Sequence, residues 1–85
     1  DSLATLKRAL TIEEAAYPPD HPNIAATLTN IGNTQQLLGD YKDSLATLQR
    51  ALTIKEATYP PDHPEIAITL TNIGSTQRRV GWSGG

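Results

Sequence analysis

The sequence of 85 residues contains no cysteine, which excludes disulfide bonds and thiolate metal sites. It also contains no apolar run of about 18 residues, the length that a membrane-spanning helix needs. Positive charge is scarce as well. The formal net charge is -2, so the chain lacks an overall basic surface for nucleic acid or anionic lipid. No secretory signal is visible, and we expect a cytoplasmic protein without nucleic-acid or membrane partners.

Patterns that carry chemistry are absent too. The sequence has no glycine-rich phosphate loop and no interleaving of aromatic with basic residues. Asp20-His21 and Asp62-His63 would suit a catalytic or metal site, but no serine, cysteine or third ligand accompanies them at a useful spacing. We interpret each pair as a helix cap followed by a turn residue. The sequence predicts no enzyme, no cofactor and no metal site.

The main positive feature is an internal repeat. Asp1-Ser-Leu-Ala-Thr-Leu recurs from Asp43, and Tyr17-Pro-Pro-Asp-His-Pro recurs from Tyr59, both at an offset of 42 residues. The offset holds without a gap as far as Gly81. A fixed period of this size predicts a solenoid array, in which each unit buries its apolar face against a neighbour. Such arrays usually form binding surfaces rather than catalytic pockets.

Apolar residues recur every three or four positions, which predicts amphipathic helices. We expect these helices near residues 1–17, 22–38, 41–59 and 64–80. Their apolar stripes comprise Ile24, Leu28 and Ile31, then Tyr41, Leu45, Leu48, Ala51, Leu52 and Ile54, and then Ile66, Leu70 and Ile73. Proline pairs at 18–19 and 60–61 end the preceding helices, because proline lacks the amide proton.

The linkers also carry signals for helix ends. Asp20 and Asp62 stand where an N-cap is expected, ahead of a proline that a first turn tolerates. Glu65 completes a pattern that resembles a capping box. Gly39 is placed to end one helix, and Asp40 to cap the next.

Glycine and threonine lower the intrinsic helix propensity of the chain. Gly32 and Gly74 lie in the middle of predicted helices, where each costs about 1 kcal/mol relative to alanine. We expect a neighbouring helix to approach closely at both. Threonine is frequent, and its branched side chain is stiff at χ1. The helices should therefore depend on packing against one another.

Four stretches together resemble a tetratricopeptide repeat: Leu28-Thr-Asn-Ile-Gly32, Leu38-Gly-Asp-Tyr41, Ser44-Leu-Ala-Thr-Leu48 and Arg50-Ala-Leu-Thr-Ile54. Their small and large residues fall at the spacing of that family's helix A and helix B. The period exceeds the usual length of about 34 residues. It is similar to the 42-residue repeats of kinesin light chains and nephrocystin-like proteins. Gln35 and Gln77 stand where the family often has an aromatic residue, so we expect looser or more polar packing there.

The resemblance implies an all-α fold, a fragment of a tetratricopeptide α-solenoid with four antiparallel helices in B-A-B-A order. One domain spans residues 1–81: helix B of a partial repeat over 1–17, a complete repeat over 22–59, and helix A of a further partial repeat over 64–80. Glycine and serine in 82–85 predict a flexible tail. The sequence starts without methionine and inside a helical pattern, so we expect a piece of a longer array, either natural or consensus-like in design.

The resemblance also implies a function. Helix A of this family lines a concave groove that binds peptides, and carboxamides suit that role because one side chain can both donate and accept hydrogen bonds. On this chain the implied exposed groove residues are Thr29, Asn30, Asn33, Gln36, Thr71, Asn72, Ser75 and Arg78, together with the neighbouring Ala26 and Ile68. Thr29 and Thr71 replace the lysine of carboxylate-clamp members, so capture of a C-terminal carboxylate is not expected.

A second hypothesis is a structural unit that self-associates. Each outer helix lacks one of its usual partners and bares an apolar edge that complements the opposite end of another copy. Head-to-tail contacts of this kind give a ring or a filament, whereas a two-fold pair or a domain swap would cover the same surfaces differently. The expected partners are therefore a protein or peptide ligand, or further copies of the chain.

Overall fold

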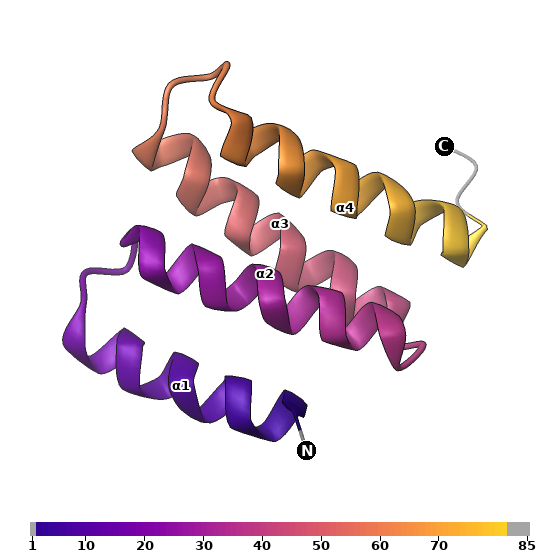
Figure 1. The fold of residues 1–85 in the computed structure, drawn as a ribbon, viewed down its shortest axis with the longest axis horizontal. Helices are drawn as coiled ribbons and strands as arrows, with labels where there is room; N and C mark the ends of the chain where they lie inside the picture. The colour runs from indigo at the N-terminus through magenta and orange to yellow at the C-terminus, as the bar shows by residue number, and fades with distance from the viewer. Residues whose placement is uncertain (1, 82–85) are drawn as a thin grey trace.

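The structure is a computed structural model that describes residues 2–81, and this part of the chain consists of helices and short linkers without a strand (Figure 1). The helices are α1 (Ser2–Ala16), α2 (Pro22–Leu37), α3 (Tyr41–Thr58) and α4 (Pro64–Val80). Every described helix end lies within one residue of its expected position. The all-α fold is confirmed, and the expected tail at 82–85 lies outside the described residues.

Each helix lies beside the next one in chain order, and successive helices run in opposite directions (Figure 1). α1 packs on α2, whereas α3 packs on both α2 and α4. α1 and α4 are therefore the outer helices. This arrangement places α1 and α3 in equivalent positions one repeat apart, and likewise α2 and α4.

The centre of the core lies between α2 and α3. Ile24, Ala25 and Leu28 of α2 pack with Ala51 and Ile54 of α3, and Leu10 of α1 packs against this cluster. Most of the predicted apolar stripes are buried or half-buried as expected.

Leu70 is a correction to the predicted stripe of α4. Its side chain is 51% exposed, whereas the equivalent Leu28 is 2% exposed. Leu28 is covered by Ala51 and Ile54 of α3. Within residues 2–81 no helix follows α4 to cover Leu70 in the same way.

The two mid-helix glycines differ in the same manner. A Cβ at Gly32 would lie 2.6 Å from Leu48 Cγ, so the expected close approach of a neighbouring helix is confirmed there. Ser44 Oγ donates to the Gly32 carbonyl at 2.7 Å, beside the same contact. At Gly74 the expectation is wrong, because a Cβ would meet nothing within 4 Å.

Histidine, rather than aspartate, caps α2 and α4. The Nδ1 atom of His21 accepts from the Asn23 amide at 3.0 Å, and His63 does the same for the Glu65 amide. The predicted caps Asp20 and Asp62 are wrong because each aspartate occupies the third position of a β-turn. The His21 amide closes the first of these turns on the Pro18 carbonyl at 3.1 Å.

The connection from α2 to α3 follows the predicted pattern more closely. Gly39 has φ +86° and ends α2, with its amide on the Gln36 carbonyl and the Asp40 amide on the Gln35 carbonyl, the two hydrogen bonds of a Schellman motif. Asp40 is the N-cap residue of α3, and its backbone carbonyl accepts the first hydrogen bond of that helix from the Ser44 amide at 2.9 Å. Its side chain makes no capping hydrogen bond.

Candidate functional site

The residues proposed for the groove lie on α2 and α4, at matching positions of two equivalent helices that run in the same direction (Figure 1). Asn30, Thr71 and Arg78 are exposed. The other polar candidates, apart from Thr29, are half-buried: Asn33, Gln36, Asn72 and Ser75. Ala26 and Ile68 are exposed, as expected.

Thr29 is a correction. Its side chain is 9% exposed, and its hydroxyl donates to the Ala25 carbonyl at 2.9 Å. The equivalent Thr71 is exposed and bonds in the same way to the Ala67 carbonyl. The hydroxyl of a mid-helix threonine is thus used within its own helix. Thr29 is unsuited to contact a peptide.

Asn30 and Asn33 line one open cleft between α2 and α1. Leu6 of α1 and Leu37 of α2 contribute apolar walls to the same cleft. Two of the predicted amides are thus brought together beside apolar surface. The α4 candidates lie outside this cleft, where Arg78 Nη2 approaches Ser75 Oγ at 3.4 Å.

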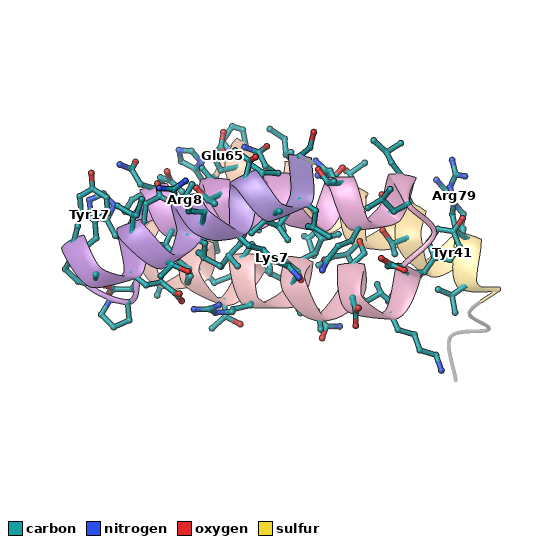
Figure 2. All side chains as sticks on the ribbon, turned by 90° about the horizontal axis from the view of Figure 1, so that it is seen from below. Lys7, Arg8, Tyr17, Tyr41, Glu65 and Arg79 are labelled. Carbon is teal, nitrogen blue, oxygen red and sulfur yellow. The ribbon has the colours of Figure 1, made fainter. Side chains whose placement is uncertain are left out.

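A second cleft lies between α1 and α3, and sequence reasoning missed it. Leu28 and Ile31 of α2 form its floor, and Lys7, Asp43 and Arg50 contribute charged groups. Figure 2 shows Lys7 directed toward α3, and Arg8 on the other flank of α1. The 42-residue period was the available signal, because it makes α1 and α3 equivalent helices of successive repeats.

Ion pairing across this cleft joins the two equivalent helices. Arg50 of α3 pairs with Glu14 of α1, and both side chains are about half exposed. An exposed pair of this kind contributes little stability, typically less than about 1 kcal/mol. The pair shows which residues of successive repeats lie opposite one another.

Lys55 is a buried charged residue that the sequence did not reveal. It is 4% exposed, and its Nζ donates to Thr69 Oγ1 at 2.8 Å and lies 3.4 Å from Glu65 Oε1. The Glu65 carboxylate is therefore directed at Lys55 instead of completing a capping box. In the preceding repeat the equivalent contact has the opposite charge, because Thr27 Oγ1 donates to Glu13 Oε1 at 2.5 Å. Residues 13 and 55 therefore both support the packing of neighbouring helices. The only sign of this role in the sequence was that one copy has glutamate and the other lysine at this position.

The expected polar packing at Gln35 is confirmed. Gln35 is 5% exposed, and its Oε1 accepts from Thr47 Oγ1 at 2.8 Å. An aromatic ring at this position would not supply the amide oxygen that accepts the hydrogen bond from the Thr47 hydroxyl. The side chain instead links α2 to α3 by a partly buried hydrogen bond.

The two histidines are occupied by structural roles. Besides capping α2, the His21 ring stacks on Tyr17 with centroids 4.1 Å apart, and His63 stacks on Tyr59 in the same way. Among residues 2–81 there is no cluster of three or more His, Cys, Asp or Glu side chains that could hold a metal ion. In the same part of the chain, none of the helices has both the length and the apolar character needed to cross a bilayer.

Antiparallel helix pairs that recur at a fixed period and pack on their neighbours define a helical-repeat scaffold, a class of protein that generally works by contacting other proteins. The tetratricopeptide repeat family pattern matches residues 1–57 and again residues 36–81. The chain belongs to the tetratricopeptide repeat family. No curated protein shows a significant similarity to it.

Proposed function

We propose that this chain is a non-enzymatic protein-interaction module that holds a peptide along one face of α2 and α4. Asn30 and Asn72 occupy equivalent positions on these helices, one repeat apart. Because each amide both donates and accepts, the two can bond backbone groups about three residues apart in an extended peptide that crosses the helices. This recurrence of amides on equivalent faces is the observation that carries the proposal.

The surroundings of the amides suggest the character of the ligand. Ile68 on α4 is 49% exposed and Leu37 on α2 is 87% exposed, so apolar side chains of a peptide have surface to cover. Arg78 and Arg79 lie in the last turn of α4, where α2 has Gln36 and Leu37. We therefore expect a ligand with apolar residues and an acidic residue near the end of α4. Thr29 is not part of this proposed surface.

An NMR titration tests this proposal. A peptide selected from a random library on the immobilised chain is added to the ¹⁵N-labelled chain. We expect the largest shifts at Asn30, Asn33 and Asn72, and weaker binding to the variant Asn30→Ala/Asn72→Ala. Asp62→Ala, in the linker, serves as the control. Shifts confined to the linkers would contradict the proposal.

The finer classification belongs to the same proposal. The 42-residue period and the Tyr-Pro-Pro-Asp-His-Pro linker support a repeat of the kinesin-light-chain and nephrocystin-like form. We place the module in the cytoplasm. Its B-A-B-A organisation over residues 1–81 gives one complete repeat, 22–59, with a half-repeat on either side.

Self-association is a second candidate function, favoured by the two outer helices. No residue of α1 is buried, although Leu3, Leu6 and Leu10 recur on it at helical spacing, and Ile12 is 62% exposed. α4 exposes about half of Leu70. Hiding such a face stabilises an oligomer by roughly 25 cal/mol per Å² before the cost of association. Light scattering should show a molar mass that rises with concentration. A constant monomer mass at millimolar protein would exclude self-association.

A further inference from the structure

We infer that the uncovered face of α4 receives α1 of a second copy of this chain, in the geometry with which α2 receives α3 inside one copy. The inference rests on the self-association proposed above. It adds the two surfaces that meet and the register in which they meet.

The first argument is that the contacting residues are identical. Inside the chain, Ala25 and Leu28 of α2 pack with Ala51 and Ile54 of α3. Shifting the α2 residues forward by 42 positions gives Ala67 and Leu70 of α4, and shifting the α3 residues back gives Ala9 and Ile12 of α1. The same four side chains are thus available at the two outer helices.

The exposed fractions of these four side chains on α1 and α4 show that no other helix covers them as it does inside the chain. Ile54 is 7% exposed, but Ile12 is 62% exposed. Leu28 is 2% exposed, but Leu70 is 51% exposed, and Ala67 is exposed where Ala25 is fully buried. Since the residue types are the same, the difference comes only from the missing neighbour. A second copy supplies that neighbour to both surfaces.

Shape complementarity supports the same register. Inside the chain, Leu48 fills the space above Gly32 so completely that a Cβ there would lie 2.6 Å from Leu48 Cγ. One repeat later the space above Gly74 is open. Leu6 of α1 is the equivalent of Leu48 and is only half-buried. In the docked pair, Leu6 of the second copy occupies the space above Gly74.

Polar groups fit the arrangement as well. Ser44 Oγ donates to the Gly32 carbonyl, and the exposed Ser2 is positioned to do the same for the Gly74 carbonyl of another copy. The Arg50–Glu14 ion pair between successive repeats would recur as Arg8 of the second copy with Glu56. No buried charge is introduced at the contact.

The sequence differences between α1 and α3 remove little from this contact. Over the equivalent residues 2–16 and 44–58 they are Lys7 for Gln49, Glu13 for Lys55, and Ala16 for Thr58, and α3 in addition begins about one turn earlier, at Tyr41. Gln49 is exposed, and Lys55 bonds to α4 instead of α2. Of these three differences only Ala16 loses a contact, because Thr58 Oγ1 donates to the Asp20 carbonyl at 3.0 Å. α1 can therefore take the place that α3 has on α2.

Two charged substitutions distinguish this head-to-tail contact from a symmetric one. Leu70→Glu blocks the α4 face and Ile12→Glu blocks the α1 face, and both side chains are exposed in the monomer. Each variant alone should be monomeric in sedimentation equilibrium under conditions where the unmodified chain associates. An equimolar mixture should form a dimer and nothing larger, because the unmodified α1 face of the Leu70→Glu variant can bind the unmodified α4 face of the Ile12→Glu variant. Circular dichroism checks that both variants keep the helical content of the unmodified chain.

The outcomes separate the inference from the function on which it rests. If the unmodified chain is monomeric at millimolar protein, self-association fails and the inference fails with it. If the unmodified chain associates but one variant alone still dimerises, or the mixture stays monomeric, then only the head-to-tail register is overturned.

Gly74→Ala provides an independent test that does not rely on a charged group. A methyl at residue 74 meets nothing in the monomer, so folding is expected to be preserved or improved. In the docked pair it overlaps Leu6 of the second copy, and association should weaken about tenfold or more. Unchanged association of Gly74→Ala would overturn the inference.

Discussion

Leu48 and Gly32 form the closest interhelical contact around any described glycine of this protein. A Cβ at residue 32 would lie 2.6 Å from Leu48 Cγ and 2.7 Å from its Cδ2. The large side chain of α3 therefore needs the small residue on α2. Gly74, at the same position of the next repeat, has open space instead. Two glycines in nearly the same sequence context are thus expected to respond differently to the same substitution.

The two glycine-to-alanine substitutions should change stability in opposite directions. Gly32→Ala gains about 1 kcal/mol of helix propensity but forces α2 and α3 apart, and overpacking of a tight core typically costs about 1–3 kcal/mol. Gly74→Ala should gain the propensity alone and raise the free energy of unfolding by about 1 kcal/mol. Urea denaturation at micromolar protein measures both. Equal shifts of the same sign would contradict the described packing.

Ser44 is expected to matter because its hydroxyl is buried between helices. Oγ donates to the Gly32 carbonyl at 2.7 Å and lies 3.5 Å from Thr76 Oγ1. Ser44→Ala should lower the free energy of unfolding by about 1 kcal/mol. The equivalent Ser2 is exposed, so Ser2→Ala should change it by less than about 0.5 kcal/mol in the monomer. An equal loss of unfolding free energy in the two variants would show that the hydrogen bond from Ser44 to the Gly32 carbonyl does not stabilise the fold.

The histidine caps predict an asymmetry within each linker. His63→Ala removes the acceptor of the Glu65 amide and the stacking partner of Tyr59, and should cost about 1 kcal/mol of stability. Asp62→Ala should have little effect, since Asp62 is a turn residue. His63→Asn should recover part of the loss, because asparagine is a good N-cap. The thermal midpoints of the three variants give the comparison, and a larger loss for Asp62→Ala would restore aspartate as the cap.

Lys55 and Glu65 should be energetically coupled. Glu65→Ala leaves the buried Lys55 ammonium with Thr69 Oγ1 as its remaining partner, and we expect a loss of about 1 kcal/mol, since Glu65 itself is 45% exposed. Lys55→Met replaces the charge by an apolar side chain of similar length and should be close to neutral. In the double variant the Glu65→Ala loss should disappear. A double-mutant cycle by urea denaturation measures this coupling, and additive losses would exclude it.

The helices could be predicted from the sequence because their signals are local. The apolar period, the proline pairs and Gly39 together placed every described helix end within one residue. The residues that cap α2 and α4 were harder to predict from the sequence. Asp20 is the better capping residue in isolation, but the hydrogen bond from the His21 amide to the Pro18 carbonyl closes a turn that places histidine next to the helix. That choice depends on how the whole linker folds.

Burial could not be predicted in the same way, because it depends on helices distant in the sequence. Leu28 and Leu70 occupy nearly identical sequence contexts, yet one is buried and the other half exposed. Thr29 and Thr71 differ likewise, which removed Thr29 from the proposed peptide-contacting set. Asn30, Asn33 and Asn72 remain predictions of the repeat pattern that await a ligand. Lys55 was missed because a lysine is ordinarily expected on the surface.

The central claim is that the helical faces left uncovered by stacking bind another polypeptide, and intermolecular paramagnetic broadening tests it most directly. Because the chain has no cysteine, Arg78→Cys provides a unique site for a nitroxide at the end of α4. Spin-labelled chain is mixed with ¹⁵N-labelled, unmodified chain at millimolar protein. We expect the amides of residues 2–6 in the ¹⁵N-labelled chain to broaden most, and those at the other end of α1, residues 12–16, to broaden much less. No broadening, or broadening centred on the far end of α1, would contradict the account.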